Sequence, residues 1–277
     1  MKKEMLDIFK RYLQEEERSS ATQEKYLYEV IQFFVWLGDE EVTKEIIVKW
    51  KQYLIQKGYK PSTINCKLSA LDQFLNLIGR SDCKVKHLRL QRRLFREVDR
   101  ELTKTEYERL VTSAYNSGKE RLALLMESIC STGIRVSEVK YLTVKAAQVG
   151  KAEIIMKGKI RTILISNKLC RKLLKYAKKQ KIVSGEIFLT KDGKSLNRKQ
   201  IWAQMKSICE KAGIVPAKVF PHNFRHMFAR IFYRVTGNLL QLADILGHSS
   251  IEVTRIYASD GIMEWKKSME MLEMLVE

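Results

Sequence analysis

The sequence predicts a mainly α-helical protein with a small β-sheet, divided into an N-terminal helical domain and a C-terminal α/β domain. Apolar residues recur at helical spacing through residues 1–80. A strongly basic stretch with irregular apolar spacing follows over residues 81–100, and β-type runs flank a glycine within residues 152–166. A length of 277 residues suits two domains of ordinary size, here 1–80 and 101–277, joined by a linker over 81–100.

Residues 1–80 are expected to form four helices that share one apolar core. Thr43 is placed to cap the third helix, because a threonine side chain accepts a hydrogen bond from the first turn. Pro61 suits the first turn of the fourth helix, where its missing N–H is not needed. Gly79 is expected to end that helix.

The expected linker is dominated by positive charge. Residues 80–100 contain eight basic residues and three acidic ones. Such a segment is suited to lie along a phosphate backbone, and a solvated surface helix is the alternative. The residues expected to contact DNA here are Lys84, Lys86, Arg89, Arg92 and Arg93.

The second domain is expected to start with Thr103 and Glu106, which have the spacing of a helix-capping box. Helices are predicted near residues 104–117, near 119–131 and from Arg135 through Leu142. A β-hairpin with glycine in its turn is predicted within 152–166, and helices follow from Asn167 onward.

The charge balance points to a polyanionic partner. The net charge is +19 and the isoelectric point is near 9.7, which indicates nucleic acid, with a merely soluble basic protein as the alternative. Residues 157–181 hold ten basic residues and no acidic one. We expect this segment to face a DNA duplex, with Lys159 and Arg161 as contacts.

Other features restrict the class of protein further. No apolar run approaches the ~20 residues of a membrane span, so no membrane partner is expected. The five cysteines are odd in number and lack metal-ligand spacing, which indicates reduced thiols in a cytoplasmic protein. His222, His226 and His248 have no cysteine or carboxylate at ligand spacing, so no metal is expected.

A set of ordered motifs carries phosphodiester chemistry, which needs a nucleophile, charge stabilisation and proton transfer. Arg135 follows Thr-Gly-Ile, and His222 and Arg225 lie one helical turn apart. His248 closes Leu-Gly-His, and Tyr257 follows nine residues later. Two arginines suit a phosphate clamp, the histidines suit hydrogen bonding or proton transfer, and the tyrosine suits nucleophilic attack.

Two residues near these motifs are expected to have structural roles. Glu138 is expected to be a structural partner of Arg135. His226 is expected to point to another helix face, as a structural core histidine.

These motifs, over the whole chain, resemble the tyrosine recombinase (phage-integrase-like) family. The resemblance implies a helical, SAM-like core-binding domain and an α/β catalytic domain that together clamp double-stranded DNA. It implies a 3′-phosphotyrosyl intermediate, strand exchange in a DNA-bound homotetramer and no cofactor. It also implies that the C-terminal helix docks on a neighbouring protomer, and that Lys157 of the hairpin turn is the general acid, with Lys159 as the alternative.

Three readings follow from these residues. The first is a site-specific recombinase of simple architecture, like Xer-type recombinases or small mobile-element integrases. The second is a type IB topoisomerase-like enzyme, and the third is a DNA-binding relative without cleavage. The sequence leaves open the DNA target, the direction of recombination and the need for an accessory protein or partner recombinase.

Overall fold

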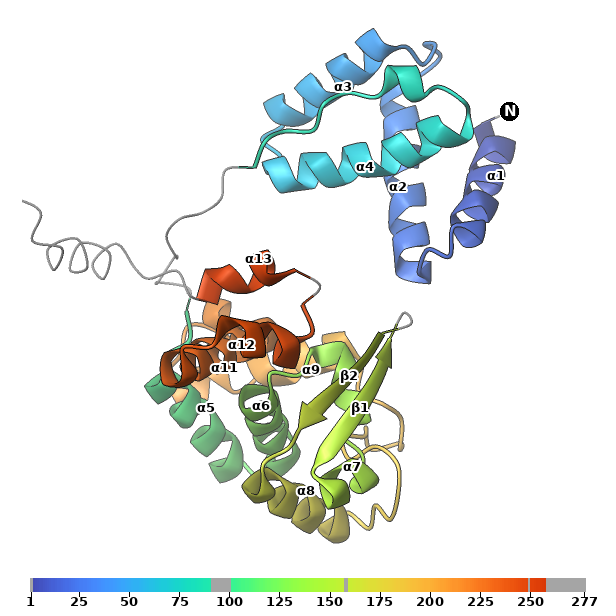
Figure 1. Ribbon diagram of the computed structural model, residues 1–277. Coiled ribbons are helices and arrows are strands. Elements are labelled where there is room, and N and C mark those ends of the chain that lie inside the picture. The colour runs from blue at the N-terminus through green and yellow to red at the C-terminus, as the bar shows by residue number, and fades with distance from the viewer. Residues whose placement is uncertain (1, 91–100, 157–158, 249, 258–277) are drawn as a thin grey trace, which may run out of the picture. The chain divides into compact units, whose positions relative to one another are not determined.

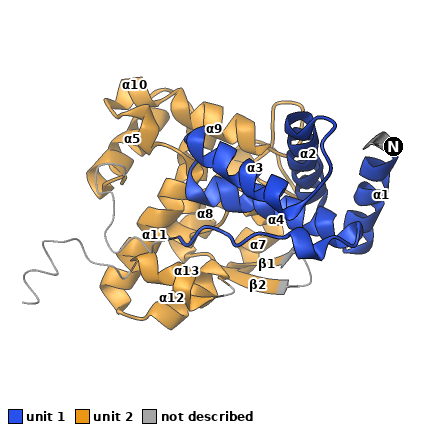
Figure 2. Ribbon diagram, turned by 90° about the horizontal axis from the view of Figure 1, so that it is seen from above, with its two compact units in different colours: residues 1–92 blue, residues 93–277 orange. Residues whose placement is uncertain are grey.

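The computed structural model describes residues 2–90, 101–156, 159–248 and 250–257, with side chains omitted for residues 2, 3, 155, 156 and 159. The chain divides into two compact units, residues 1–92 and 93–277, coloured separately in Figure 2. Each unit has its own apolar core. The described elements are helices and one β-hairpin, so the predicted fold class is confirmed.

Unit 1 contains the four predicted helices and an aromatic core. Phe9 meets Phe74 edge-to-face with 5.5 Å between ring centroids, and Phe33 meets Trp50 in the same way at 5.7 Å. These rings come from all four helices, so the core ties the whole bundle together. The helices are α1 (Lys2–Glu15), α2 (Ser20–Leu37), α3 (Lys44–Gln56) and α4 (Pro61–Leu77) (Figure 1).

The ends of these helices follow the local sequence signals. Thr43 Oγ1 accepts a hydrogen bond from Ile46 N at 3.3 Å, as a cap of α3 should. Pro61 lies in the first turn of α4. Gly79 follows that helix with a φ of 69°, a left-handed conformation that glycine adopts without strain. The three predicted signals are confirmed.

The first part of the expected linker is held on unit 1. After the short 3₁₀ helix η1 (Ser81–Cys83), the side chain of Asn65 donates to Leu88 O at 2.9 Å and accepts from Leu88 N at 2.8 Å. Lys51 Nζ donates to Lys86 O at 2.6 Å. Residues 84–88 are therefore an anchored strap of unit 1, and Arg92 and Arg93 lie outside the described residues.

Unit 2 is built around α6 (Glu120–Thr132), which contacts α5 (Lys104–Asn116), α8 (Asn167–Lys179) and α11 (Pro221–Thr236). The predicted capping box of α5 is present. The remaining elements are η3 (Val136–Tyr141), α7 (Val144–Val149), β1 (Lys151–Met156), β2 (Lys159–Leu164), α9 (Arg198–Lys206), α10 (Cys209–Ala212), η4 (Pro216–Lys218), α12 (Leu239–Leu246), α13 (Ile251–Thr254) and η5 (Arg255–Tyr257) (Figure 1).

The predicted hairpin is present as an antiparallel pair in which Ile154 lies opposite Arg161 and Met156 opposite Lys159. Ala152, Ile154 and Ile163 are buried, so one face of the hairpin packs on the core of unit 2. The helix predicted from Arg135 through Leu142 is a 3₁₀ helix over Val136–Tyr141. Within the described ranges, no helix is both long and apolar enough to cross a bilayer.

Candidate active site

Arg135 is positioned by the turn that ends α6. Gly133 ends that helix with a φ of 64°, and an alanine Cβ there would lie 2.5 Å from a ring carbon of Phe228. Beyond the turn, Glu138 accepts hydrogen bonds from Arg135 N and from Arg135 Nη1, both at 2.9 Å. The Arg135 side chain remains 38% exposed, so it is anchored on one side and open to a ligand on the other.

Arg225 lies on α11 and is 2% exposed. Its Nη1 donates to Gly133 O at 2.6 Å, and its Nη2 donates to Leu246 O at 2.7 Å. Burial, followed by the charges of Arg135 and Arg161, lowers the pKa of Arg225 to about 10. The guanidinium therefore stays cationic at neutral pH while it is fixed by two backbone carbonyls.

Two helix C-termini neutralise the arginines. Gly133 follows α6 and Gly247 follows α12, and both glycines are left-handed. Arg135 Nη2 donates to Gly247 O at 2.9 Å, and Arg161 Nη1 donates to Leu246 O. The C-terminal end of a helix carries a partial negative charge, so these ends stabilise a cluster of cations that would otherwise repel each other.

Arg161, which the sequence predicts as a DNA contact, has a side chain that is only 10% exposed. Its Nη2 donates to Glu138 Oε2 at 2.6 Å, and a Cβ added to Gly247 would lie 2.4 Å from its Cδ. Burial lowers the pKa of Arg161, and the charge of Glu138 opposes that shift. Arg161 thus ties the hairpin to the carboxylate that orients Arg135.

His248 connects Arg225 to the segment of Tyr257. Arg225 Nη2 lies 3.2 Å from His248 Nε2, and Thr254 Oγ1 lies 2.9 Å from His248 Nδ1. Burial, followed by the charges of Arg225, Arg135 and Arg161, lowers the pKa of His248 to about 4. His248 is therefore neutral at physiological pH.

Tyr257 lies in η5 and is 5% exposed. Its ring is near-parallel to that of His248, with 6.4 Å between centroids, and meets the ring of His226 edge-on at 5.0 Å. It packs in a small apolar cluster with Ala229 and Leu246. The candidate nucleophile is therefore held beside the histidines rather than out in solvent.

His226 corrects an expectation, because it is not a core histidine on another face. Its Nε2 lies 2.7 Å from His222 Nε2, and it contacts the ring of Tyr257. Burial, followed by the charge of Arg225, lowers the pKa of His222. Residues four apart lie on the same side of a helix, so this spacing was the signal that indicated the contact.

The described residues bring together five of the six predicted catalytic positions: Arg135, His222, Arg225, His248 and Tyr257. Lys157 and the side chain of Lys159 lie outside the described residues, so the choice between these two lysines stays a prediction. In unit 1, Lys86 and Arg89 are exposed and Lys84 is half-buried. The expected structural role of Glu138 is confirmed by its bonds to Arg135.

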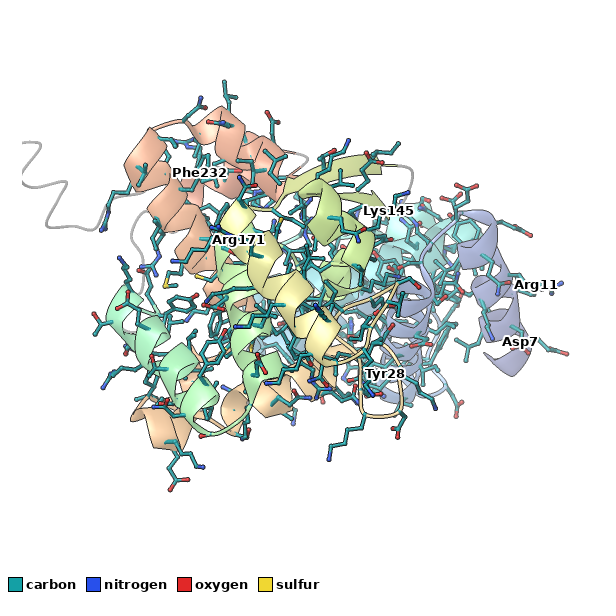
Figure 3. The ribbon with its side chains drawn as sticks, turned by 90° about the horizontal axis from the view of Figure 1, so that it is seen from below. Asp7, Arg11, Tyr28, Lys145, Arg171 and Phe232 are labelled. Atoms are coloured by element: carbon teal, nitrogen blue, oxygen red, sulfur yellow. The ribbon has the colours of Figure 1, made fainter. Side chains whose placement is uncertain are left out.

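The acid-free segment 157–181 is partly neutralised by acidic residues from elsewhere. Lys172 pairs with Glu127 at 2.5 Å, and Lys179 pairs with Glu120 at 2.6 Å. The charge of this segment is thus balanced in part within unit 2, although Arg171 of α8 remains exposed (Figure 3). Among the described residues, no group of three histidine, cysteine or acidic side chains is arranged to hold a metal.

A groove of about 1180 Å³ opens beside the arginines. Arg135 and His248 line one part of it, and Ile160 and Leu164 of the hairpin line another. Phe232 of α11, labelled in Figure 3, adds to the apolar wall. A charged site therefore adjoins an apolar surface.

Comparison with known proteins agrees with this fold. Residues 100–261 match the phage integrase family, and residues 6–80 match the phage integrase N-terminal SAM-like domain. The chain belongs to the phage integrase family. It is a site-specific DNA recombinase of the tyrosine type.

The similarity to these relatives extends along nearly the whole chain. The tyrosine recombinase XerA of Thermococcus kodakarensis is 25% identical over 280 residues, which cover 98% of this chain and 96% of that protein. The XerA of Pyrococcus furiosus is 27% identical over 282 residues, with coverages of 99% and 96%.

Solved structures share the fold. A post-cleavage complex of the XerH site-specific recombinase with a palindromic difH substrate has a TM-score of 0.72 and 18% identity, covering 93% of this chain and 81% of that one. A lambda integrase dimer bound to a core site has a TM-score of 0.71 and 18% identity, with coverages of 94% and 95%.

Proposed function

We propose that this recombinase cleaves and rejoins duplex DNA through a 3′-phosphotyrosyl intermediate formed by Tyr257. The observation that carries the proposal is the convergence of Tyr257, His248 and Arg225 within one set of contacts. The phenolic oxygen attacks the phosphorus, the bond to the 5′-oxygen breaks, and the new ester keeps the energy needed for rejoining. No cofactor takes part in these steps.

Each neighbour of Tyr257 has a role in this step. Arg135 and Arg225 bind the non-bridging oxygens, whose negative charge grows in the transition state. His222 and His248 take part in hydrogen bonding and in moving the phenolic proton. Lys157 of the hairpin turn protonates the leaving 5′-oxygen, with Lys159 as the alternative. Replacing each lysine by alanine should separate them. A substrate with a 5′-phosphorothiolate leaving group needs no general acid, so it should restore cleavage only to the variant that lacks the catalytic lysine.

DNA binding is proposed to extend over both units. Lys86 on the strap of unit 1 is exposed, as is Arg89 just after the strap, and Lys84 at the start of the strap is half-buried. Together with Arg92, Arg93 and Lys159 they form a basic set that suits phosphate contacts. Replacing Lys86 and Arg89 by glutamine should weaken binding uniformly across sequences and reduce its dependence on salt.

Assembly on DNA is proposed to be a homotetramer joined through residues 258–277. The apolar wall of the groove, with Ile160, Leu164 and Phe232, offers a surface of the chemistry that the Met-rich tail requires. A chain ending at residue 261 should bind DNA as smaller complexes in a gel-shift experiment. All five cysteines are unpaired, which favours a reducing compartment such as the cytoplasm.

Covalent trapping tests the central proposal. Protein and nicked duplex DNA from the flanks of its own gene are mixed without metal, denatured and examined for protein-linked DNA. The wild type should form an adduct, and Tyr257→Phe should bind without forming one. An adduct formed equally by Tyr257→Phe would overturn the assignment. Binding without any adduct from a nicked substrate would favour a DNA-binding relative, and relaxation of supercoils without site preference would favour a topoisomerase.

A further inference from the structure

Arg161 lies in the β-hairpin and is held by the same groups that hold the phosphate clamp, Arg135 and Arg225. Glu138 Oε2 accepts a hydrogen bond from Arg161 Nη2 at 2.6 Å and one from Arg135 N at 2.9 Å. Leu246 O accepts from Arg225 Nη2 at 2.7 Å and also from Arg161 Nη1. The hairpin and the clamp therefore share two fixed acceptors.

The place of Arg161 in the hairpin makes it the anchor closest to the turn. It lies opposite Ile154, and residues directly opposite each other share one face of a strand pair. Toward the base of the hairpin, that face continues with the pair Ala152 and Ile163, which is buried in the apolar core. Among the side chains that the structure describes, Arg161 is the one on this face nearest the turn, and Lys157 follows β1 directly.

An arginine at this position is costly for the fold. The Nε of Arg161 is buried without a hydrogen-bond partner among the described residues, and an unpaired buried N–H lowers stability. A third cation also adds repulsion to the charges of Arg135 and Arg225. A Cβ on Gly247 would lie 3.1 Å from Arg161 Nη1, so that glycine leaves room for the guanidinium. These costs favour a role in the reaction over a role in stability.

We propose that Arg161 is a positioning residue that sets the hairpin turn, and with it the general acid, in register with the phosphate clamp. The inference rests on the proposed function, since it concerns the lysine that protonates the leaving 5′-oxygen. The clamp binds the non-bridging oxygens, and the lysine must reach the bridging oxygen of the same phosphate. Proton transfer needs the donor within hydrogen-bond distance, so a small displacement of the turn slows departure of the leaving group.

The effect should be confined to the acid, because the clamp has further contacts of its own. Without Arg161, Arg135 keeps its two hydrogen bonds to Glu138. Arg225 keeps its bonds to two backbone carbonyl oxygens. Loss of Arg161 therefore separates the position of the hairpin from the position of the clamp.

A change of leaving group tests this separation. Single-turnover adduct formation is measured on nicked duplex DNA from the flanks of the gene, with either the ordinary 5′-oxygen or a 5′-bridging sulfur, which leaves without a general acid. Arg161→Gln should cleave the oxygen substrate about 10- to 100-fold more slowly than the wild type and should regain most of that loss on the sulfur substrate. The variant that lacks the catalytic lysine should behave in the same way, whereas Arg135→Lys should stay slow on both.

Arg230 supplies the matched control. Its Nη1 donates to Glu101 Oε2, its Nη2 donates to Leu102 O at 2.7 Å, and its Nε is likewise buried without a partner among the described residues. Any loss of rate in Arg230→Gln should be the same on both substrates. Arg161→Lys keeps the charge but lacks the two-pronged guanidinium, so it should show a smaller loss with the same recovery on sulfur. It takes the place of Arg161→Gln if that variant does not fold.

Equal losses of Arg161→Gln on the two substrates, or no loss, would overturn the inference. So would an unchanged rate with weaker and less salt-dependent DNA binding, which would make Arg161 a DNA contact. Backbone hydrogen exchange gives a reading that needs no reaction, because Arg161→Gln should speed exchange in β2 and leave α8 unchanged. If the wild type forms no adduct on either substrate, the proposed reaction fails, whereas unchanged exchange in Arg161→Gln would overturn the anchoring role by itself.

Discussion

The two units of the chain organise their interiors in different ways. Unit 1 has an aromatic core, and its largely buried ion pair, Lys67 with Glu29, joins α4 to α2 within that unit. Unit 2 encloses Glu138, Arg225 and Thr254 among its buried residues, and all three belong to the candidate site or contact it. Burying charge lowers stability unless every group is paired. In unit 2 the buried charged groups therefore lie at the candidate site, where the proposed chemistry requires fixed cations.

The largest expected effect comes from removing the carboxylate that unit 2 buries. Glu138→Gln leaves Arg161 without its anion and turns an amide N–H toward Arg135, so unfolding should become easier by about 3–5 kcal/mol. The adduct rate should fall by at least about 100-fold, because Arg135 loses its orientation. Urea denaturation and covalent trapping measure the two effects.

The matched variant in unit 1 is Glu29→Gln, which breaks the pair with Lys67. It should lower stability by a similar amount, while the folded protein keeps its adduct rate. A wild-type rate in Glu138→Gln would break the distinction between the two units.

Glycine-to-alanine substitutions in the two units should lower stability by smaller amounts, and by different amounts in each unit. At Gly247, with a φ of 59°, an alanine Cβ would lie 2.4 Å from Arg161 Cδ. At Gly58 of unit 1, with a φ of 73°, it would meet nothing within 4 Å. We expect Gly58→Ala to lower stability by about 1 kcal/mol and Gly247→Ala by about 2–3 kcal/mol, because only the second adds a steric clash. Thermal unfolding of both variants measures the difference, and equal losses would contradict the packing.

Acid should act on unit 2 through its histidines. An unfolded histidine takes up its proton near pH 6.5, whereas burial and the arginines hold the pKa of His248 at about 4. Between these values the unfolded state binds more protons, so stability should fall as the pH is lowered from about 6.5 to 4 and should not change from this cause above 6.5. Urea denaturation at pH 7 and pH 5 should show a smaller loss for His248→Gln than for the wild type. An identical loss in the variant would assign the effect to other groups.

The smallest effects are expected at exposed ion pairs, where the two units should behave alike. Lys104 and Glu108 in unit 2 lie 3.9 Å apart with mostly exposed side chains, and Arg18 and Glu16 in unit 1 lie 3.8 Å apart. Lys104→Ala and Arg18→Ala should each change stability by less than about 0.5 kcal/mol. A loss above about 1 kcal/mol from either would show that the difference between the units is not confined to buried charge.

Local signals in the sequence were sufficient for much of the fold. Thr43, Pro61 and the Thr103–Glu106 pair each act within one turn of helix, so their structural roles could be read from neighbouring residues. The β-hairpin and the order of the site motifs were visible for the same reason. The 3₁₀ geometry of Val136–Tyr141 was not visible, since the same segment had the pattern of an ordinary helix.

Long-range contacts explain what the sequence did not predict. Arg161 lies in a basic segment and suggested a DNA contact, but its partner Glu138 is 23 residues away and Leu246 is 85 residues away. The strap is held at Leu88 by Asn65, which lies 23 residues earlier in the chain, so no local pattern indicates this contact. His226 is the exception, since its spacing from His222 was enough to place both rings together.

The backbone anchoring of the arginines has a consequence for how the site tolerates sequence change. Arg225 and Arg135 are held by the carbonyl oxygens of Gly133, Leu246 and Gly247. Every amino acid supplies that carbonyl, so substitution cannot delete these acceptors and can only displace them. The mutational sensitivity of the clamp should therefore concentrate at the two glycines and at Glu138. Leu246, whose side chain serves the apolar cluster, remains free to exchange for another apolar residue without loss of its acceptor.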